Sequence, residues 1–218
     1  MTPSNPSLTL TDRQFSSALQ LRLLLTAPSG SCSSCNEPEF FSHGEWCRIR
    51  AAGPRISRHN GFRDILADRA SALGSKVARE PTADASGSDP KNRGDIQVKG
   101  QVAPDGASGV IDITFAAVSA PLYLERIKTI IQQPGESTRD WTKRQLGYLL
   151  AFREKDKRLK YRNCFRDPFS ALAFSTGGFP SSKSKQWLLR LQSTKRRSES
   201  FIFDLSAVLA RAKAAALN

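Results

Sequence analysis

The stretch Arg93–Phe115, "RGDIQVKGQVAPDGASGVIDITF", decides the fold that the sequence predicts. It reads as two short apolar strands, at about 95–99 and 110–117, joined by a turn rich in proline, glycine and aspartate. Each strand carries one aspartate, Asp95 and Asp112, where a core strand normally has an apolar side chain. The segment therefore predicts a β-hairpin that holds two carboxylates.

The two carboxylates are expected to meet. Side chains alternate between the faces of a strand, so Asp95 and Asp112 point away from their apolar neighbours and converge on one polar face if the strands pair. Close carboxylates repel each other unless a cation lies between them, and oxygen ligands of this kind suit Mg²⁺. Glu80, at the end of the expected strand "KVARE", can add a third oxygen. The alternative is that the aspartates cap turns or pair with Arg93 and Lys99.

Elements of the rest of the chain follow from hydrophobic periodicity and from breaks at glycine and proline. We expect helices at about 11–25, 60–73, 121–133, 139–162, 183–192 and 203–218, and further strands at 76–80 and within 169–180. This order predicts an α/β fold whose core is a helix, a three-stranded meander, a helix and a strand. The expected parts are a lead and helix at 1–27, a zinc knuckle at 28–52, the core at 55–192, and a basic linker with a C-terminal helix at 193–218.

Three of the four cysteines cluster in "CSSCNEPEFFSHGEWC", which has the spacing C-x2-C-x7-H-x3-C. Two close pairs of sulfur and nitrogen ligands separated by a short loop suit tetrahedral zinc, and four protein ligands indicate a structural site. The predicted zinc ligands are Cys32, Cys35, His43 and Cys47. The alternative is a loop of reduced cysteines with a chance histidine.

The composition indicates a polyanionic partner. The chain has 33 Lys and Arg against 20 Asp and Glu, a net charge of +13, which favours nucleic acid over a merely basic soluble protein. The first residues lack the pattern of a signal peptide, and no apolar run has the length of a membrane helix. We therefore expect a protein that is not secreted, is not anchored in a membrane, and is nuclear or cytoplasmic.

Much of the positive charge lies in the predicted helix 139–162, where Arg153, Lys157 and Lys160 fall at i, i+4 and i+7 and so share one face. The alternative is a solvated basic face. Arg58 and His59 stand just before the predicted helix 60–73, where a phosphate can meet free backbone amides. For His59, capping or local packing is the stronger interpretation.

The order and spacing of several short pieces give the sequence a resemblance. These pieces are "FSSALQLRLLL" before "CSSC", the H-x3-C pair, "RHNGFRDILADRA", "REP", "GDIQV", "VIDIT", "REKDKRLKY" and "FSALAFSTGG". Together, over roughly residues 11–191, they resemble the restriction-like endonuclease region at the C-terminus of non-LTR retrotransposon proteins, a branch of the PD-(D/E)XK nuclease superfamily. Such a region implies a restriction-endonuclease-like core that nicks DNA with Mg²⁺ or Mn²⁺.

The resemblance implies roles for single residues. Asp95 matches the aspartate of the PD half-motif, with Gly94 in place of proline, and Asp112 matches the acidic residue of (D/E)XK. Thr114 stands where many members have a lysine; in this branch a "K-x2-K-Y" stretch supplies it. That stretch implies a catalytic Lys157 or Lys160. The stretch leaves open which of the two it is. The glutamate of "REP" implies an assisting role for Glu80. We expect DNA contacts from Arg58, Arg153, Arg158 and Tyr161.

Two rival interpretations stay open at this point. The departures at Gly94 and Thr114 are compatible with a relic of such an element that binds nucleic acid and no longer cuts it. A structural zinc protein whose charge serves contacts with RNA is the other alternative, and the RNA of a mobile element is a conceivable partner for either.

Overall fold

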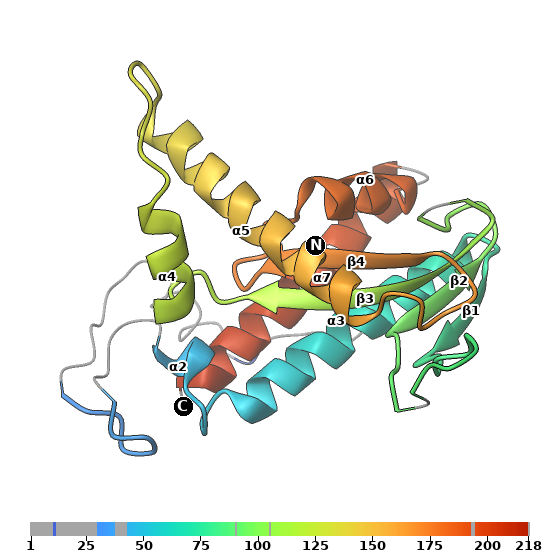
Figure 1. Ribbon diagram of the computed structural model, residues 1–218, viewed down its shortest axis with the longest axis horizontal. Coiled ribbons are helices and arrows are strands. Elements are labelled where there is room, and N and C mark those ends of the chain that lie inside the picture. The colour runs from blue at the N-terminus through green and yellow to red at the C-terminus, as the bar shows by residue number, and fades with distance from the viewer. Residues whose placement is uncertain are drawn as a thin grey trace.

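The computed structural model describes residues 11, 30–37, 43–89, 91–104, 106–192 and 195–217. The predicted lead and helix at 1–27 lie outside this described part, apart from Thr11. What is described is a mixed α/β fold, with a four-stranded sheet and helices packed on both of its faces (Figure 1).

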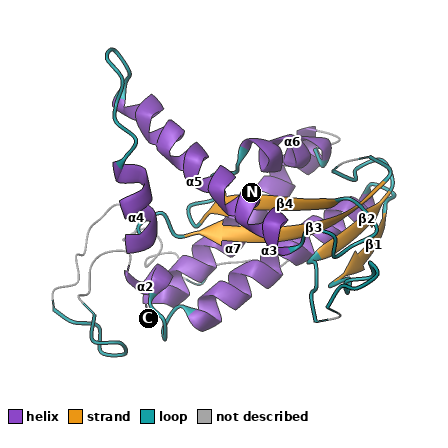
Figure 2. Ribbon diagram, viewed as in Figure 1, coloured by secondary structure: helices purple, strands orange, loops and turns teal. Residues whose placement is uncertain are grey.

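The sheet has the strand order β1-β2-β3-β4 (Figure 2). Strands β1 (Lys76–Arg79), β2 (Ile96–Lys99) and β3 (Ser108–Ala116) form an antiparallel meander, and β4 (Phe169–Ser175) joins β3 in parallel. A parallel neighbour needs a crossover connection, which here runs through helix α5 (Thr138–Lys160). The predicted hairpin and mixed sheet are therefore confirmed.

One face of the sheet packs against helix α3 (Ala52–Ala72). Phe62 and Leu66 of α3 are buried in the main core, which also holds apolar side chains of β2, β3 and β4. Helix α7 (Lys195–Leu217) lies beside α3 and adds Val208 and its neighbours to this core (Figure 1). The two helices approach closely, since a Cβ atom on Gly61 would lie 3.2 Å from the Val208 side chain. The C-terminal helix is thus packed into the core rather than appended to it.

Helix α5 covers the opposite face of β3 and β4 with Leu149 and Leu150, which pack on Ala116 and Ala173. Asp112 lies on this face and is only 3% exposed. The face on which Asp95 and Asp112 were expected to converge is therefore covered by α5. The first half of α5 and helix α4 (Pro121–Lys128) extend away from the sheet as an arm (Figure 1).

Helix α3 begins eight residues earlier than the sequence predicts, at Ala52 rather than Asn60. Pro54 lies in its first turn, where a missing backbone N–H costs no hydrogen bond, so the proline does not stop the helix. Arg58 and His59 are consequently inside α3, and the expectation that they precede a helix is wrong. The remaining short helices are α2 (His43–Trp46) and α6 (Ser182–Arg190).

Among the helices that the structure describes, none combines the length and the apolar character that crossing a membrane requires.

Candidate active site and metal centre

Asp95 and Asp112 are neighbours across the β2–β3 hairpin. The register pairs Ile96 with Ile111, so the residue before β2 lies opposite Asp112. The Asp95 amide donates to the Ile111 carbonyl at 2.8 Å, and Asp95 Oδ2 accepts a hydrogen bond from the Ile113 amide. The backbone of β3 thereby holds the Asp95 carboxylate beside Asp112.

The ionised form of the Asp112 carboxylate is in an unfavourable environment. Burial and the charge of Asp95 raise its pKa, while Lys157 acts in the opposite direction. Lys157 Nζ lies 3.3 Å from Oδ1, to which it donates, and 3.0 Å from Oδ2. Although that second distance is short, buried Oδ2 accepts no hydrogen bond of adequate geometry. A buried carboxylate whose Oδ2 accepts no hydrogen bond, with a second carboxylate nearby, favours binding of a cation in addition to Lys157.

Of the two candidate lysines, only Lys157 contacts an acidic candidate. Lys160 is exposed, and its Nζ lies 4.8 Å from the centroid of the Tyr161 ring. Tyr161 is buried at the C-terminal end of α5, where burial and then the charge of Asp112 raise the pKa of its hydroxyl. The structure therefore places Lys157 and Tyr161 at the carboxylates and leaves Lys160 exposed to solvent.

A second cation from α5 reaches the same strand. Arg153, one helical turn before Lys157, donates from Nη2 to Thr114 Oγ1 at 3.1 Å. Thr114 is 5% exposed and stands where the resemblance expects a lysine. The positive charge missing from β3 is thus supplied by the helix above it.

His59 contacts Asp95, and the sequence analysis did not predict this contact. Its Nε2 lies 3.1 Å from Asp95 Oδ2, across 36 residues of sequence. The hydrogen bond to Asp95 is the main cause that raises the pKa of His59. No signal in a single sequence indicates this contact, because it depends on how α3 packs against the sheet.

Glu80 lies next to Asp95 through its backbone, since its amide donates to the Asp95 carbonyl at 2.9 Å. Its carboxylate contacts Arg63, and Arg93 lies 3.7 Å away. Glu80 also has a left-handed backbone with φ of 51°, which is uncommon for this residue type. Two arginines thus hold the side chain that the sequence offers as a third oxygen ligand.

The arginine candidates for DNA contact differ in exposure. Arg58 is 5% exposed, and its guanidinium lies over the Phe115 ring at 4.9 Å, so it packs in the core. Arg158 is exposed on α5. It belongs to a basic rim that we define as the exposed cations Lys155, Arg158, Lys160 and Arg162.

The cysteine and histidine ligands form one compact cluster, in which the four candidate ligand atoms lie within 4.8 Å of one another. Cys32 Sγ is 4.0 Å from Cys47 Sγ, and Cys35 Sγ is 3.1 Å from His43 Nε2. Tetrahedral zinc with Zn–S bonds of about 2.3 Å separates two sulfurs by about 3.8 Å, so the cluster fits zinc. The Ser34 backbone N–H is the main cause that lowers the pKa of Cys32 to about 6, which favours the thiolate that a metal binds.

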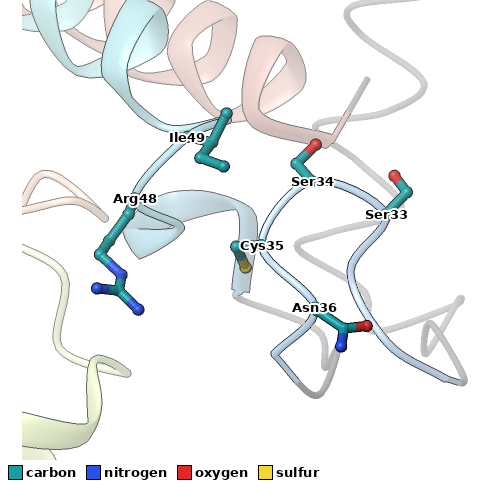
Figure 3. A pocket seen from close by; sticks show the side chains of 6 residues that line it. All are labelled: Ser33, Ser34, Cys35, Asn36, Arg48 and Ile49. Atoms are coloured by element: carbon teal, nitrogen blue, oxygen red, sulfur yellow. The ribbon is translucent and has the colours of Figure 1, made fainter.

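The cluster is docked on the core. Glu45 of α2 accepts a hydrogen bond from Thr176, at the end of β4, at 2.7 Å through its Oε2 atom. Its outer side is an open hollow of about 700 Å³ lined by Ser33, Ser34, Cys35, Asn36, Arg48 and Ile49 (Figure 3). Cys35 is the half-buried ligand of the four, whereas the other three are buried.

Comparison of the chain with protein-family models and with curated proteins finds no match.

Proposed function

We propose that the chain is a metal-dependent DNA endonuclease that hydrolyses phosphodiester bonds and leaves nicks. The observation that carries the proposal is the meeting of Asp95, Asp112 and Lys157 at one place under α5. The motif order resembles the restriction-like endonuclease region of retrotransposon reverse transcriptase proteins, and we propose that the chain derives from such an element with a restriction-endonuclease-like core.

Asp112 and Asp95 would hold Mg²⁺ or Mn²⁺, and the buried Oδ2 of Asp112 without a hydrogen bond supports this fit. When bound, such an ion polarises a phosphoryl oxygen and lowers the pKa of a coordinated water. The Asp112 carboxylate is costly to keep ionised without a cation, because burial and the Asp95 charge raise its pKa. The pair is thus arranged to gain from a divalent ion.

Lys157 would supply positive charge to the scissile phosphate. Its ammonium lies 3.0 Å from Asp112 Oδ2, so it is already next to the place where the phosphate must bind. Charge that develops on phosphate oxygens during hydrolysis is stabilised by such a cation in a site with little water. Arg153, held on Thr114 Oγ1 at 3.1 Å, adds a second cation on the same strand.

DNA would approach along the basic rim. Residues 139–166 contain ten Lys and Arg and three Asp and Glu, and the four rim cations are exposed on α5 and just after its end. Exposed cations neutralise phosphates without reading sequence, which suits a nicking enzyme whose affinity falls as salt rises. The zinc in the cluster of Cys32, Cys35, His43 and Cys47 would be structural, because four protein ligands leave no open position.

A supercoiled plasmid tests the proposal. We expect purified zinc-loaded protein to convert it to open circles with Mg²⁺ or Mn²⁺, and not with Ca²⁺ or without a divalent ion. Chelators are avoided because they also remove zinc. Asp89→Asn, which removes an acid from an exposed loop, is the matched control for Asp112→Asn. Salt-sensitive binding without cutting in the wild type would identify a binding module instead.

A further inference from the structure

We propose that His59 is a positioning residue that fixes the Asp95 carboxylate in the orientation that binds the divalent ion. This inference rests on the proposed metal-dependent function of the same site. His59 Nε2 lies 3.1 Å from Asp95 Oδ2, and that oxygen also accepts the Ile113 amide. One donor therefore comes from α3 and the other from β3, and together they determine the rotation of the carboxylate.

The histidine stands on a rigid part of the molecule. It is three residues before Phe62 and seven before Leu66, so it lies half-buried at the edge of the buried stripe of α3. The Phe62 ring meets the Phe115 ring edge-on at 5.2 Å and the Phe174 ring at 4.8 Å. These ring contacts tie α3 to β3 and β4, and a helix packed in this way cannot slide without moving the strand that carries Asp112.

Helix α7, which lies beside α3, adds to this constraint. A Cβ on Gly61 would approach Val208 to 3.2 Å, so α3 has little room to shift toward α7. The packing of α3 thus fixes the position of the His59 ring relative to Asp95. A ring held in this way sets the orientation of a metal-binding carboxylate through a hydrogen bond, as outer partners of metal ligands do.

The same geometry argues against His59 as a general base. Its Nε2 is engaged by Asp95, and its Nδ1 lies 3.5 Å from Oδ1 of Asn60, the next residue of α3. A base must present a free nitrogen lone pair to the attacking water. Both nitrogens of His59 face acceptor oxygens, so holding Asp95 is the role that this arrangement supports.

Mn²⁺ binding to zinc-loaded protein, measured by calorimetry, tests the inference without depending on cleavage. His59→Ala should weaken Mn²⁺ about 10–100-fold, the usual cost of losing such a partner. His59→Gln, whose amide N–H can reach the carboxylate, should recover part of the affinity. Asp68→Asn is the matched control: it removes the charge of one of the two α3 carboxylates that pair with Arg79 in β1, and no contact of Asp68 with Asp95 is seen, so the variant should bind Mn²⁺ as the wild type does.

The dependence of the DNA cleavage rate on Mn²⁺ concentration is the second measurement. With His59→Ala, the metal concentration for half-maximal rate should rise, and saturating Mn²⁺ should restore most of the rate. Unchanged Mn²⁺ affinity in a folded His59→Ala protein would overturn the inference, and so would a wild type that binds no Mn²⁺ at an Asp112-dependent site. If the wild type binds Mn²⁺ there, needs His59 for it and cuts no DNA, the inference stands and the proposed endonuclease fails.

Discussion

Lys157 Nζ lies 3.0 Å from Asp112 Oδ2, although 45 residues separate the two in sequence. The contact exists because α5 crosses over β3 on the way to β4, which lays the last turns of the helix above the middle of the strand. The helix thereby gives the carboxylate a cation that its own strand lacks, since Thr114 occupies the next position on that face.

Lys157 and Lys160 are predicted to differ strongly in their effect on cutting. Lys157→Met removes the ammonium beside Asp112, and single-turnover cleavage should slow by about 10²–10³-fold, as when a charge-stabilising donor is lost. Lys160→Met changes a rim residue and should slow it less than about 10-fold. Rapid-quench rates at saturating protein measure both. The opposite ranking would move the catalytic role to Lys160.

Removing the charge of Asp112 should stabilise the protein when no divalent ion is added. Its pKa is raised by burial and by Asp95, so the folded state holds the proton more tightly than the unfolded chain does. Ionisation therefore costs stability above the raised pKa, and the cost disappears as pH falls through it. At neutral pH, Asp112→Asn should raise Tm by about 2–4 °C, the shift that about 1 kcal/mol causes at this chain length.

The effect of Mg²⁺ on the Tm of the wild type and of Asp112→Asn gives a second prediction, which thermal unfolding measures. Mg²⁺ should raise the Tm of the wild type through binding to the folded state, and it should leave Asp112→Asn unchanged. The difference in Tm between Asp112→Asn and the wild type, both without Mg²⁺, should become smaller at acid pH. A Tm gain that is equal at neutral and acid pH would show that the Asp112 charge is not its cause.

Gly94 is predicted to be required by sterics in this chain. A Cβ there would lie 2.4 Å from Val110 Cγ1, and the Gly94 amide donates to the Pro81 carbonyl at 2.9 Å. Gly94→Ala should cost about 1–3 kcal/mol by overpacking, and Val110→Ala in the same chain should recover part of it. Urea unfolding of the wild type, the two single variants and the double variant measures the coupling free energy between the two positions.

Gly94→Pro introduces the proline that the motif of the resembled superfamily has at this position, and it should destabilise the protein. A proline both collides with Val110 and removes the amide donor to Pro81. The packing of the hairpin thus gives a physical reason for glycine at this position. A Gly94→Pro protein as stable as the wild type would contradict this steric account.

The cysteine cluster is predicted to bind about one zinc per chain. Cys32→Ser should lose the zinc and lower Tm, because the cluster is docked on the core through Glu45 and Thr176. Cys164→Ser is the control, since Cys164 is a buried thiol outside the cluster. Elemental analysis of the purified proteins gives the zinc content. Full zinc in Cys32→Ser, or loss of it in Cys164→Ser, would contradict the assignment.

The sequence predicts what depends on local pattern. The alternation of "DIQVK" and "VIDITF" around a glycine-containing turn predicts the hairpin, and the hairpin brings Asp95 to Asp112. The cysteine and histidine spacing predicts the cluster for the same reason, because the ligands lie within sixteen residues, Cys32–Cys47. Short-range spacing of this kind is a property of the chain before any packing.

The rest depends on how helices pack. Lys157 and Lys160 are both on the basic helix, and only the seating of Leu149 and Leu150 on the sheet decides which one faces Asp112. His59 is missed because α3 extends back through Pro54, which reads as a break in the sequence. The rotation of a helix and its first turn are fixed by tertiary contacts that periodicity does not show.

The single-turnover rate of DNA cleavage by Asp112→Asn, beside the wild type and Asp89→Asn, tests the central claim most directly. Affinity for the same DNA is measured in Ca²⁺, where no cutting is expected. The account predicts Mg²⁺-dependent nicking by the wild type and Asp89→Asn. It also predicts a rate at least about 10³-fold lower for Asp112→Asn with DNA affinity unchanged. Equal cutting by all three proteins, or none by the wild type despite tight binding, would contradict it.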